Sequence, residues 1–317
     1  MAMTQLKPAE DIKPELFRKI SKDEAKAEKI ERESLSAWAD IWYRFRKNTF
    51  SMICFYIIIF MVVAAIFGPM IVPWDPTVND LFATNEPPNM TSWNAHWFGT
   101  DDFGRDMFAR TWEGAKVSLQ VGVYAALIDL VIGVVYGSIM GYVGGRVDEI
   151  MNKTAEILYA IPNLLIAILL VVVFEPSLWS IIIALSITGW ISMAWIVRGQ
   201  IIQLKNQEYV LASRSLGAGM WRIMFRHLIP NAMGPIIVTL TLTIPSAIFA
   251  EAFLSYLGLG VQVPHASWGT MINDSLAVMQ IYPWRFLFPA FFISLTMLAF
   301  NVMGDGLRDA FDPKMKK

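Results

Sequence analysis

Long apolar runs alternate with polar segments along this chain, and six of the runs are about twenty residues long. A helix of that length spans the hydrocarbon core of a bilayer, so the pattern predicts six transmembrane helices. Six crossings place both ends of the chain on the same side of the membrane. The predicted fold class is therefore an all-α polytopic membrane protein, with spans at residues 50–72, 117–142, 150–174, 178–197, 228–253 and 284–303.

The third predicted span differs from the others at its start. The stretch "RVDEIMNKTAEILYAIPN" carries several charged residues before Pro162. Proline inside a helix removes a backbone hydrogen bond and bends the helix. We therefore expect this helix to extend well into the cytoplasm and to bend at Pro162.

Basic residues form three groups in the polar segments. These groups precede the first span, separate the fourth span from the fifth, and end the chain: Arg44, Arg46 and Lys47; Arg198, Lys205, Arg214, Arg222 and Arg226; and Lys314, Lys316 and Lys317. Segments rich in Lys and Arg remain on the cytoplasmic side, so both termini are predicted to be cytoplasmic. The loops at residues 73–116 and 254–283 then face the opposite side.

The same pattern divides the chain into four parts. Residues 1–48 form a cytoplasmic N-terminal segment, in which the apolar positions of "SLSAWADIWYRFRKN" recur at helical spacing before a basic cluster. This spacing favours an interfacial helix, with an amphipathic helix packed on protein as the alternative. Residues 49–116 hold the first transmembrane helix and a long extracytoplasmic loop, residues 117–304 the transmembrane core, and residues 305–317 a cytoplasmic tail.

Composition narrows the possible functions. Hydrophobic residues make up 55% of the chain and charged residues 17%, which is typical of an integral membrane protein. The single cysteine, Cys54, forms no intrachain disulfide, and one Cys with three His gives no thiolate metal cluster. The sequence has no phosphate-binding loop and no short motif of a metal or serine hydrolase. We therefore expect no catalytic site and no bound cofactor in this chain.

Asp129 is the one clear ionisable residue inside a predicted span. A carboxylate at that depth costs about 2.5 to 3.5 kcal/mol on insertion scales, so it should face a cavity or a polar partner and not lipid. It either lines a translocation path, where it would attract a cationic or amino group, or forms a structural hydrogen bond to a neighbouring helix. An ion-coupled secondary transporter or channel subunit is the alternative function. One carboxylate gives little support for the proton relay that such a transporter would need.

Three further patterns each have a structural and a functional interpretation. The small residues of "GVVYGSIMGYVGG" predict close helix packing, with substrate contact as the alternative. In the long loop, Asp101, Asp102 and Asp106 lack the ligand spacing of an EF-hand, so helix capping and turn formation are predicted. Aromatic side chains of that loop either anchor it at the lipid headgroups, as Trp commonly does, or dock another protein: Trp93, Trp97, Phe98 and Phe103.

The basic loop between the fourth and fifth spans contains "YVLASRSLGAGMWRIMFRHLIPN". Residues 208–216 are good helix formers. Gly217 can adopt the left-handed backbone conformation that ends a helix and reverses the chain, after which a second helix starts from Met220. The pattern therefore predicts a short helix, a glycine turn and a helix that continues into the bilayer.

Within this loop, "LASRSLG" followed nine residues later by "HLIP" resembles the cytoplasmic signature of binding-protein-dependent ABC transporter permeases. That signature is E-A-A-x-x-x-G, nine residues, and I-x-L-P. The matching positions, in order, are Leu211, Ala212, Ser213, Gly217, His227, Ile229 and Pro230. Leu211 replaces the Glu of the signature, so a charged contact at that position is not carried over.

Other segments look like the oligopeptide, dipeptide and nickel permease group, specifically its C-type subunit. They occur in order and cover roughly residues 35–313: "WADIWYRFRKN", "HWFGTDDFGRDMFAR", "GYVGGRVDEIM", "EAFLSYLGLGVQVPHASWG" and "NVMGDGLRDAFDP". The resemblance implies a type I ABC importer permease with the MetI-like fold, in the cytoplasmic membrane of a bacterium.

The resemblance also implies partners. The short helix near residues 208–219 would dock on a cytoplasmic ATPase through Leu211, Ala212, Ser213, Gly217, Ala218 and Pro230. Two ATPase subunits would bind the ATP, a homologous B-type permease would form the other half of the path, and an extracytoplasmic solute-binding protein would deliver the substrate. Membrane lipid surrounds the chain, and no nucleic acid is expected. The substrate stays open between an oligopeptide, a dipeptide, nickel and another solute.

Overall fold

The computed structural model describes residues 36–312, so the predicted tail from Lys314 onward and most of the predicted N-terminal segment lie outside the described residues. The described part is largely helical and contains no β-strand, which agrees with the predicted all-α class. Its chain from Ile41 onward forms one compact unit.

Five helices of the described chain are long and apolar enough to cross a membrane. They are α3 (Thr49–Phe67, continued by the short helix η3, Gly68–Met70), α4 (Met107–Val143), α7 (Leu178–Leu204), α11 (Met233–Tyr256) and α13 (Pro283–Phe311). A further pair, α5 (Gly145–Ala160) and α6 (Asn163–Phe174), passes the same test together but is bent by 75°. The predicted apolar runs are thus helical, and the third is the one that is broken.

The break between α5 and α6 lies at the proline predicted to cause it. α5 ends at Ala160, and α6 begins directly after Pro162, which has no amide hydrogen to donate. Ile161 is extended, as expected for the residue before a proline. The predicted bend is confirmed, and it makes two helices out of one predicted span.

The start of α4 differs from the prediction. The helix begins at Met107 and not at residue 117, because Asp106 caps it. The Oδ1 atom of Asp106 accepts a hydrogen bond from the amide of Ala109 at 2.7 Å. The predicted extracytoplasmic loop is correspondingly shorter at its C-terminal end, and the predicted capping role of this aspartate is confirmed.

The last helix also extends past its predicted end. α13 continues to Phe311, through part of the segment predicted as a tail. Gly306 and Ala310 are buried, whereas Asp305 and Arg308 are exposed. This extension of the helix therefore has one packed side and one polar side. Charged residues shorten the apolar run without ending the helix, which is why hydropathy alone places its end too early.

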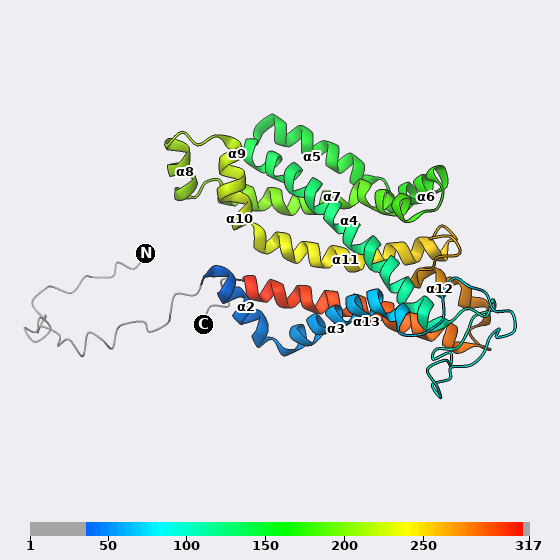
Figure 1. Ribbon diagram of the computed structural model, residues 1–317. Coiled ribbons are helices and arrows are strands. Elements are labelled where there is room, and N and C mark those ends of the chain that lie inside the picture. The colour runs from blue at the N-terminus through cyan, green and yellow to red at the C-terminus, as the bar shows by residue number, and fades with distance from the viewer. Residues whose placement is uncertain (1–35, 313–317) are drawn as a thin grey trace, which may run out of the picture. The chain divides into compact units, whose positions relative to one another are not determined.

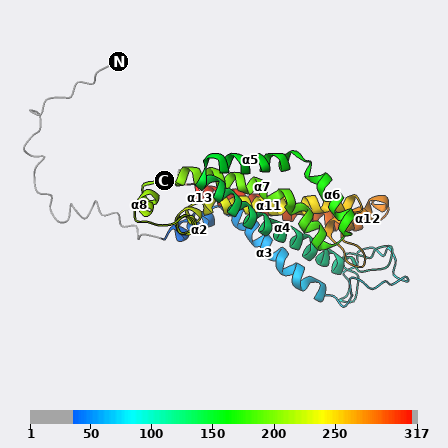
Figure 2. The same ribbon diagram turned by 90° about the horizontal axis from the view of Figure 1, so that it is seen from above.

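α4 is the central helix of the bundle. Figures 1 and 2 show it running beside α7 and α11, while α3 lies along α13. Three glycines of α4 allow its close approach to α7, because Cβ atoms on Gly133, Gly137 or Gly141 would collide with that helix. The predicted packing role of these small residues is confirmed.

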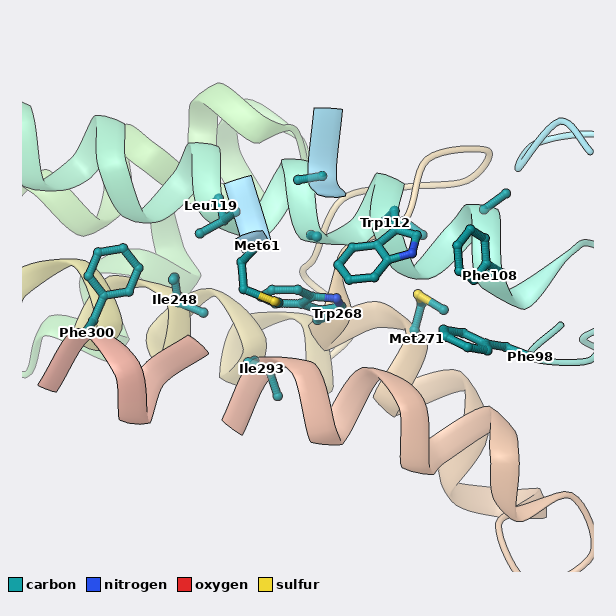
Figure 3. Packing of buried hydrophobic residues seen from close by; sticks show 14 of the residues in the cluster. Met61, Phe98, Phe108, Trp112, Leu119, Ile248, Trp268, Met271, Ile293 and Phe300 are labelled. Carbon is teal, nitrogen blue, oxygen red and sulfur yellow. The ribbon is translucent and has the colours of Figure 1, made fainter. Parts of the chain in front are cut away.

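The largest buried cluster lies where α12 (Trp268–Ser275) meets the membrane helices. Trp268 is fully buried, and its Nε1 donates a hydrogen bond to the carbonyl of Thr111 in α4 at 3.0 Å. Figure 3 shows the Met61 side chain of α3 against the Trp268 ring and Ile293 of α13 close by. This cluster joins α3, α4, α12 and α13, and it continues along α13 to Phe300 and Ala310.

The loop between η3 and α4 is held by ion pairs. Arg105 Nε lies 2.7 Å from Oδ2 of Asp101, and both side chains are about 5% exposed. Arg285 at the start of α13 contacts Asp102 at 3.0 Å. The amide of Phe103 donates to Oδ1 of Asp101 at 2.9 Å, so the predicted turn role of this acidic segment is confirmed.

The aromatic residues of this loop have different surroundings. Phe98 is buried and stacks on Phe288 with 3.9 Å between ring centroids, so it belongs to the core and neither anchors nor docks. Trp97 packs edge-on against Phe108. Trp93 is 60% exposed and donates to the carbonyl of Ile71 at 2.6 Å, which leaves its indole ring available at the surface.

Candidate coupling site

The short helix predicted in the basic loop is α8 (Glu208–Ser215), and a glycine turn closes it. The amide of Ala218 donates to the carbonyl of Ser213 at 3.1 Å, and the amide of Gly217 donates to that of Arg214 at 2.9 Å, which is the Schellman arrangement. Gly217 has a φ of 81°. The prediction that Gly217 ends the helix in the left-handed conformation is confirmed.

α8 is attached to the bundle mainly through one apolar side chain. Val210 is fully buried. It belongs to a cluster supplied by α7, α11 and the segment between α8 and α11: Met193, Val197, Ile201, Ile223, Met224, Leu228, Ala232 and Ile236. A single buried position fixes where this short helix lies and leaves most of its surface free.

The free surface of α8 carries two residues that match the family signature, Leu211 and Ala212, and Leu216 follows directly after the helix. Leu211 is 46% exposed, Leu216 is 88% exposed, and Ala212 is also exposed. Ser213 and Ala218 are half-buried, at the side where α8 meets the bundle. A short helix with exposed apolar side chains is suited to docking in a groove of another protein.

His227 connects α8 to the following helix. Its Nε2 lies 3.4 Å from the hydroxyl of Ser213, and its ring centroid lies 6.4 Å from that of Tyr209. Partial burial raises the pKa of the Tyr209 hydroxyl above its ordinary value. Two positions of the signature, Ser213 and His227, thus meet in space although they belong to different helices.

The chain after the glycine turn contains a π-helix that the sequence reasoning did not foresee. α9 (Met220–Ile223) begins at the predicted residue and passes into the π-helix η4 (Met224–Leu228) and α10 (Ile229–Asn231) before α11. The amide of Ile229 donates to the carbonyl of Met224, five residues back. The fifth span is predicted to begin at Leu228, but its regular helix, α11, begins at Met233, after this irregular segment.

Pro230 gives the physical reason for the π-helix, and it was the signal that could have predicted it. Proline has no amide to donate to the carbonyl of Arg226, and its ring would clash with that carbonyl in a regular α-helix. A wider π turn removes the clash. The exposed Pro230 is therefore a backbone element of the site and not part of a hydrogen-bond network.

An ion pair that the sequence did not predict joins α7 to α5. Arg198 of α7 binds Asp148 of α5 through two hydrogen bonds, at 2.5 Å from Nε and 2.7 Å from Nη2. Such bidentate pairs have a strict geometry. Nothing in the local spacing of either residue shows that positions fifty apart in the sequence meet.

Asp129 lies apart from α8, in the seam between α4 and α7. Its carboxyl group is buried and faces Gly189 of α7, so it does not face lipid within this chain. Its Oδ1 atom has no hydrogen-bond partner in the described part of the chain. The structural hydrogen bond considered for it is therefore not formed by that oxygen here. Within residues 36–312, no group of three or more His, Cys, Asp or Glu is arranged to hold a metal ion.

Comparison with protein families gives two matches that together cover most of the chain. The model for the "Binding-protein-dependent transport system inner membrane component" matches residues 133–317, which include the whole of the candidate coupling site. The model for the "N-terminal TM domain of oligopeptide transport permease C" matches residues 36–88.

Similarity to individual proteins extends over nearly the full length. The oligopeptide transport system permease protein OppC of Bacillus subtilis is 55% identical over 97% of this chain and 100% of its own length. The dipeptide transport system permease protein DppC of the same organism is 54% identical over 92% of this chain and 90% of its own length. OppC of Escherichia coli K12 is 41% identical over 91% of this chain and 95% of its own length.

Proposed function

This chain belongs to the family of binding-protein-dependent transport system inner membrane components, and from that premise we propose that it forms half of the membrane path of an ATP-driven peptide importer. It is a multi-pass permease subunit of the ABC importer type. Its substrates are oligopeptides or dipeptides. The similarity to one relative named for oligopeptide transport and one named for dipeptide transport supports this assignment.

The observation that carries the proposal is the form of α8. This helix is held at Val210, closed by the left-handed Gly217 and exposed along Leu211 and Ala212. It therefore has a defined position and an uncovered surface. In the proposed function that surface docks on a cytoplasmic ATPase subunit, and a second ATPase subunit binds a homologous B-type permease.

The direction of the chain in the membrane follows from its basic residues. The end of the bundle that holds α8 carries Arg214, Arg222 and Arg226, and the positive-inside rule assigns it to the cytoplasm together with both termini. The loop between η3 and α4 and the segment around α12 then face outward. They offer the surface on which a solute-binding protein would release its peptide.

Reconstitution tests the proposed function. The complete chain would be purified with its B-type permease and two ATPase subunits and placed in proteoliposomes with ATP inside and the binding protein outside. We expect uptake of a radiolabelled tripeptide or dipeptide that needs the binding protein and every subunit. Uptake of nickel without uptake of either peptide would contradict the proposed substrate class, and peptide uptake without the ATPase subunits would contradict the proposed mechanism.

A further inference from the structure

Two basic residues hold the last turn of α4 from the side of α8. Lys205, directly after α7, donates from Nζ to the carbonyl of Gly141 at 2.7 Å and lies 3.5 Å from that of Tyr142. The guanidinium of Arg214 in α8 lies over the ring of Tyr142, 5.5 Å from its centroid. Figure 1 shows α8 at the end of the bundle where α4 passes into α5.

Both contacts are favourable for physical reasons. The last carbonyls of a helix lack partners within the helix and carry partial negative charge, so a lysine ammonium group stabilises them. An arginine over an aromatic ring is attracted by the negative face of that ring. Of the two basic residues, only Arg214 belongs to α8. Its contact therefore connects α8 directly to α4, which is not adjacent to α8 in the sequence.

The opposite end of α4 is joined to α12. The carbonyl of Thr111 accepts a hydrogen bond from Nε1 of Trp268, and the hydroxyl of Ser118 accepts one from the amide of Trp268 at 3.3 Å. Ser118 also donates to Oε2 of Glu251 in α11 at 3.0 Å, and Glu251 is fully buried. α4 is one uninterrupted helix of 37 residues, so it is about 55 Å long.

We propose that Arg214, Tyr142 and Lys205 form a clasp that passes a displacement of α8 to α4, and through α4 to α12 at the opposite end of the bundle. The inference rests on the proposed function, because it takes the ATPase subunits as the source of that displacement. Without the clasp, α8 is held mainly by Val210, which packs in a cluster of apolar side chains. Without the contact between Arg214 and Tyr142, a displacement of α8 would move α4 less.

Arg214 has a competing role, since an exposed arginine on α8 is also suited to binding an acidic residue of an ATPase subunit. The two roles differ in what Tyr142 does. A docking role for Arg214 does not involve Tyr142, whereas the clasp requires its ring. Tyr142→Leu removes the ring at similar volume, and Tyr142→Phe keeps it.

The experiment measures three quantities in the reconstituted complex: peptide imported per ATP hydrolysed, ATPase subunits retained on purification, and the unfolding temperature. We expect Tyr142→Leu and Arg214→Gln each to lower the import per ATP about two- to fivefold, with ATPase subunits retained. Tyr142→Phe should resemble the wild type. The double variant Tyr142→Leu/Arg214→Gln should be no worse than either single variant, because both changes remove the same contact.

Arg222→Gln is the matched control. Arg222 is exposed on α9 in the same loop and makes no hydrogen bond, ion pair or ring contact with α4 among the described residues. Its loss should leave the import per ATP unchanged.

Four results would overturn the clasp: normal coupling in Tyr142→Leu, additive losses in the double variant, an equal loss in Arg222→Gln, or loss of ATPase subunits from Arg214→Gln alone. A fall in unfolding temperature that matches the loss of coupling in Tyr142→Leu but is absent from Arg214→Gln would assign Tyr142 to folding and also overturn it. A wild-type complex without any ATP-driven uptake would instead reject the proposed function.

Discussion

Gly217 and Gly219 flank one turn but have different backbone conformations. Gly217 has a φ of 81°, whereas Gly219 is extended with a φ of −71°. Neither has an atom within 4 Å of the position that a Cβ would occupy. A side chain at either position therefore meets no steric obstacle, and only the conformation of Gly217 resists substitution.

This difference predicts the result of a matched pair of substitutions. Gly217→Val should destabilise the turn by about 1–2 kcal/mol or more, because a β-branched residue resists the left-handed conformation. ATP-driven uptake should fall while the amount of protein in the membrane stays near that of the wild type. Gly219→Val should keep uptake, and Gly217→Asn should lie between the two because Asn tolerates this conformation better.

Expression level, retained ATPase subunits and uptake would be measured side by side for these variants. Normal uptake in Gly217→Val would remove the turn from the mechanism. Equal loss in Gly219→Val would show that the loop tolerates no side chain there, for a reason other than backbone conformation.

Asp129 is a second residue whose buried surroundings lead to a prediction. Its buried Oδ1 atom in the α4–α7 seam has no hydrogen-bond partner in the described part of the chain, so no contact there stabilises the ionised carboxylate. Asp129→Asn keeps the shape and removes the charge, so we expect an unfolding temperature equal to or above that of the wild type in detergent. A clear decrease would show that the ionised carboxylate stabilises the chain and would contradict this expectation.

At the scale of elements, the coupling segment shows which features local sequence determines. The bounds of α8 and the left-handed Gly217 were predicted because helix propensity and glycine conformation act within a few residues. The π-helix η4 was not predicted, although Pro230, which accounts for it, lies in the same segment. The early start of α4 depends on a cap at Asp106, which the apolar pattern does not contain.

Contacts between elements that are far apart in the sequence could not be predicted from local sequence patterns. Arg198 with Asp148 and Arg214 with Tyr142 combine residues that are far apart in the sequence and unremarkable in their own segments. Asp129 was correctly expected to avoid lipid, because the cost of burying charge is general. Which oxygen would find a donor depends on the neighbouring helix, and the sequence does not specify that neighbour.

The π-helix gives a prediction of its own. Pro230→Ala restores an amide that can donate to the carbonyl of Arg226, so the segment should relax toward a regular α-helix and change the position of α8 relative to α11. We expect lower uptake per ATP with unchanged insertion in the membrane. Pro235→Ala is the control, because proline is tolerated in the first turn of a helix such as α11.

For Pro230→Ala and its control, uptake, ATP hydrolysis and retained ATPase subunits would be measured together. Unchanged coupling in Pro230→Ala would show that the irregular turn is only a consequence of the proline. A similar loss in Pro235→Ala would indicate a general sensitivity of this helix and not of the π-helix.

At the scale of the whole molecule, apolar length and basic residues together predict the topology, which labelling can test. In a variant with Cys54→Ala, a cysteine at Asn79 or Val263 should react with an impermeant thiol reagent in intact cells, and one at Leu216 should not. All three positions are exposed. Labelling of the Leu216→Cys variant from outside would reverse the orientation.

The most direct measurement of the central claim is the energy source for peptide uptake in proteoliposomes that contain the complete complex and the loaded binding protein. Initial uptake would be compared with ATP inside the vesicles and no ion gradient, and with an imposed proton or sodium gradient and no ATP. The account predicts uptake only with ATP, accompanied by ATP hydrolysis that the loaded binding protein stimulates. Uptake driven by the ion gradient in the absence of ATP would contradict it and would make this chain part of a secondary transporter.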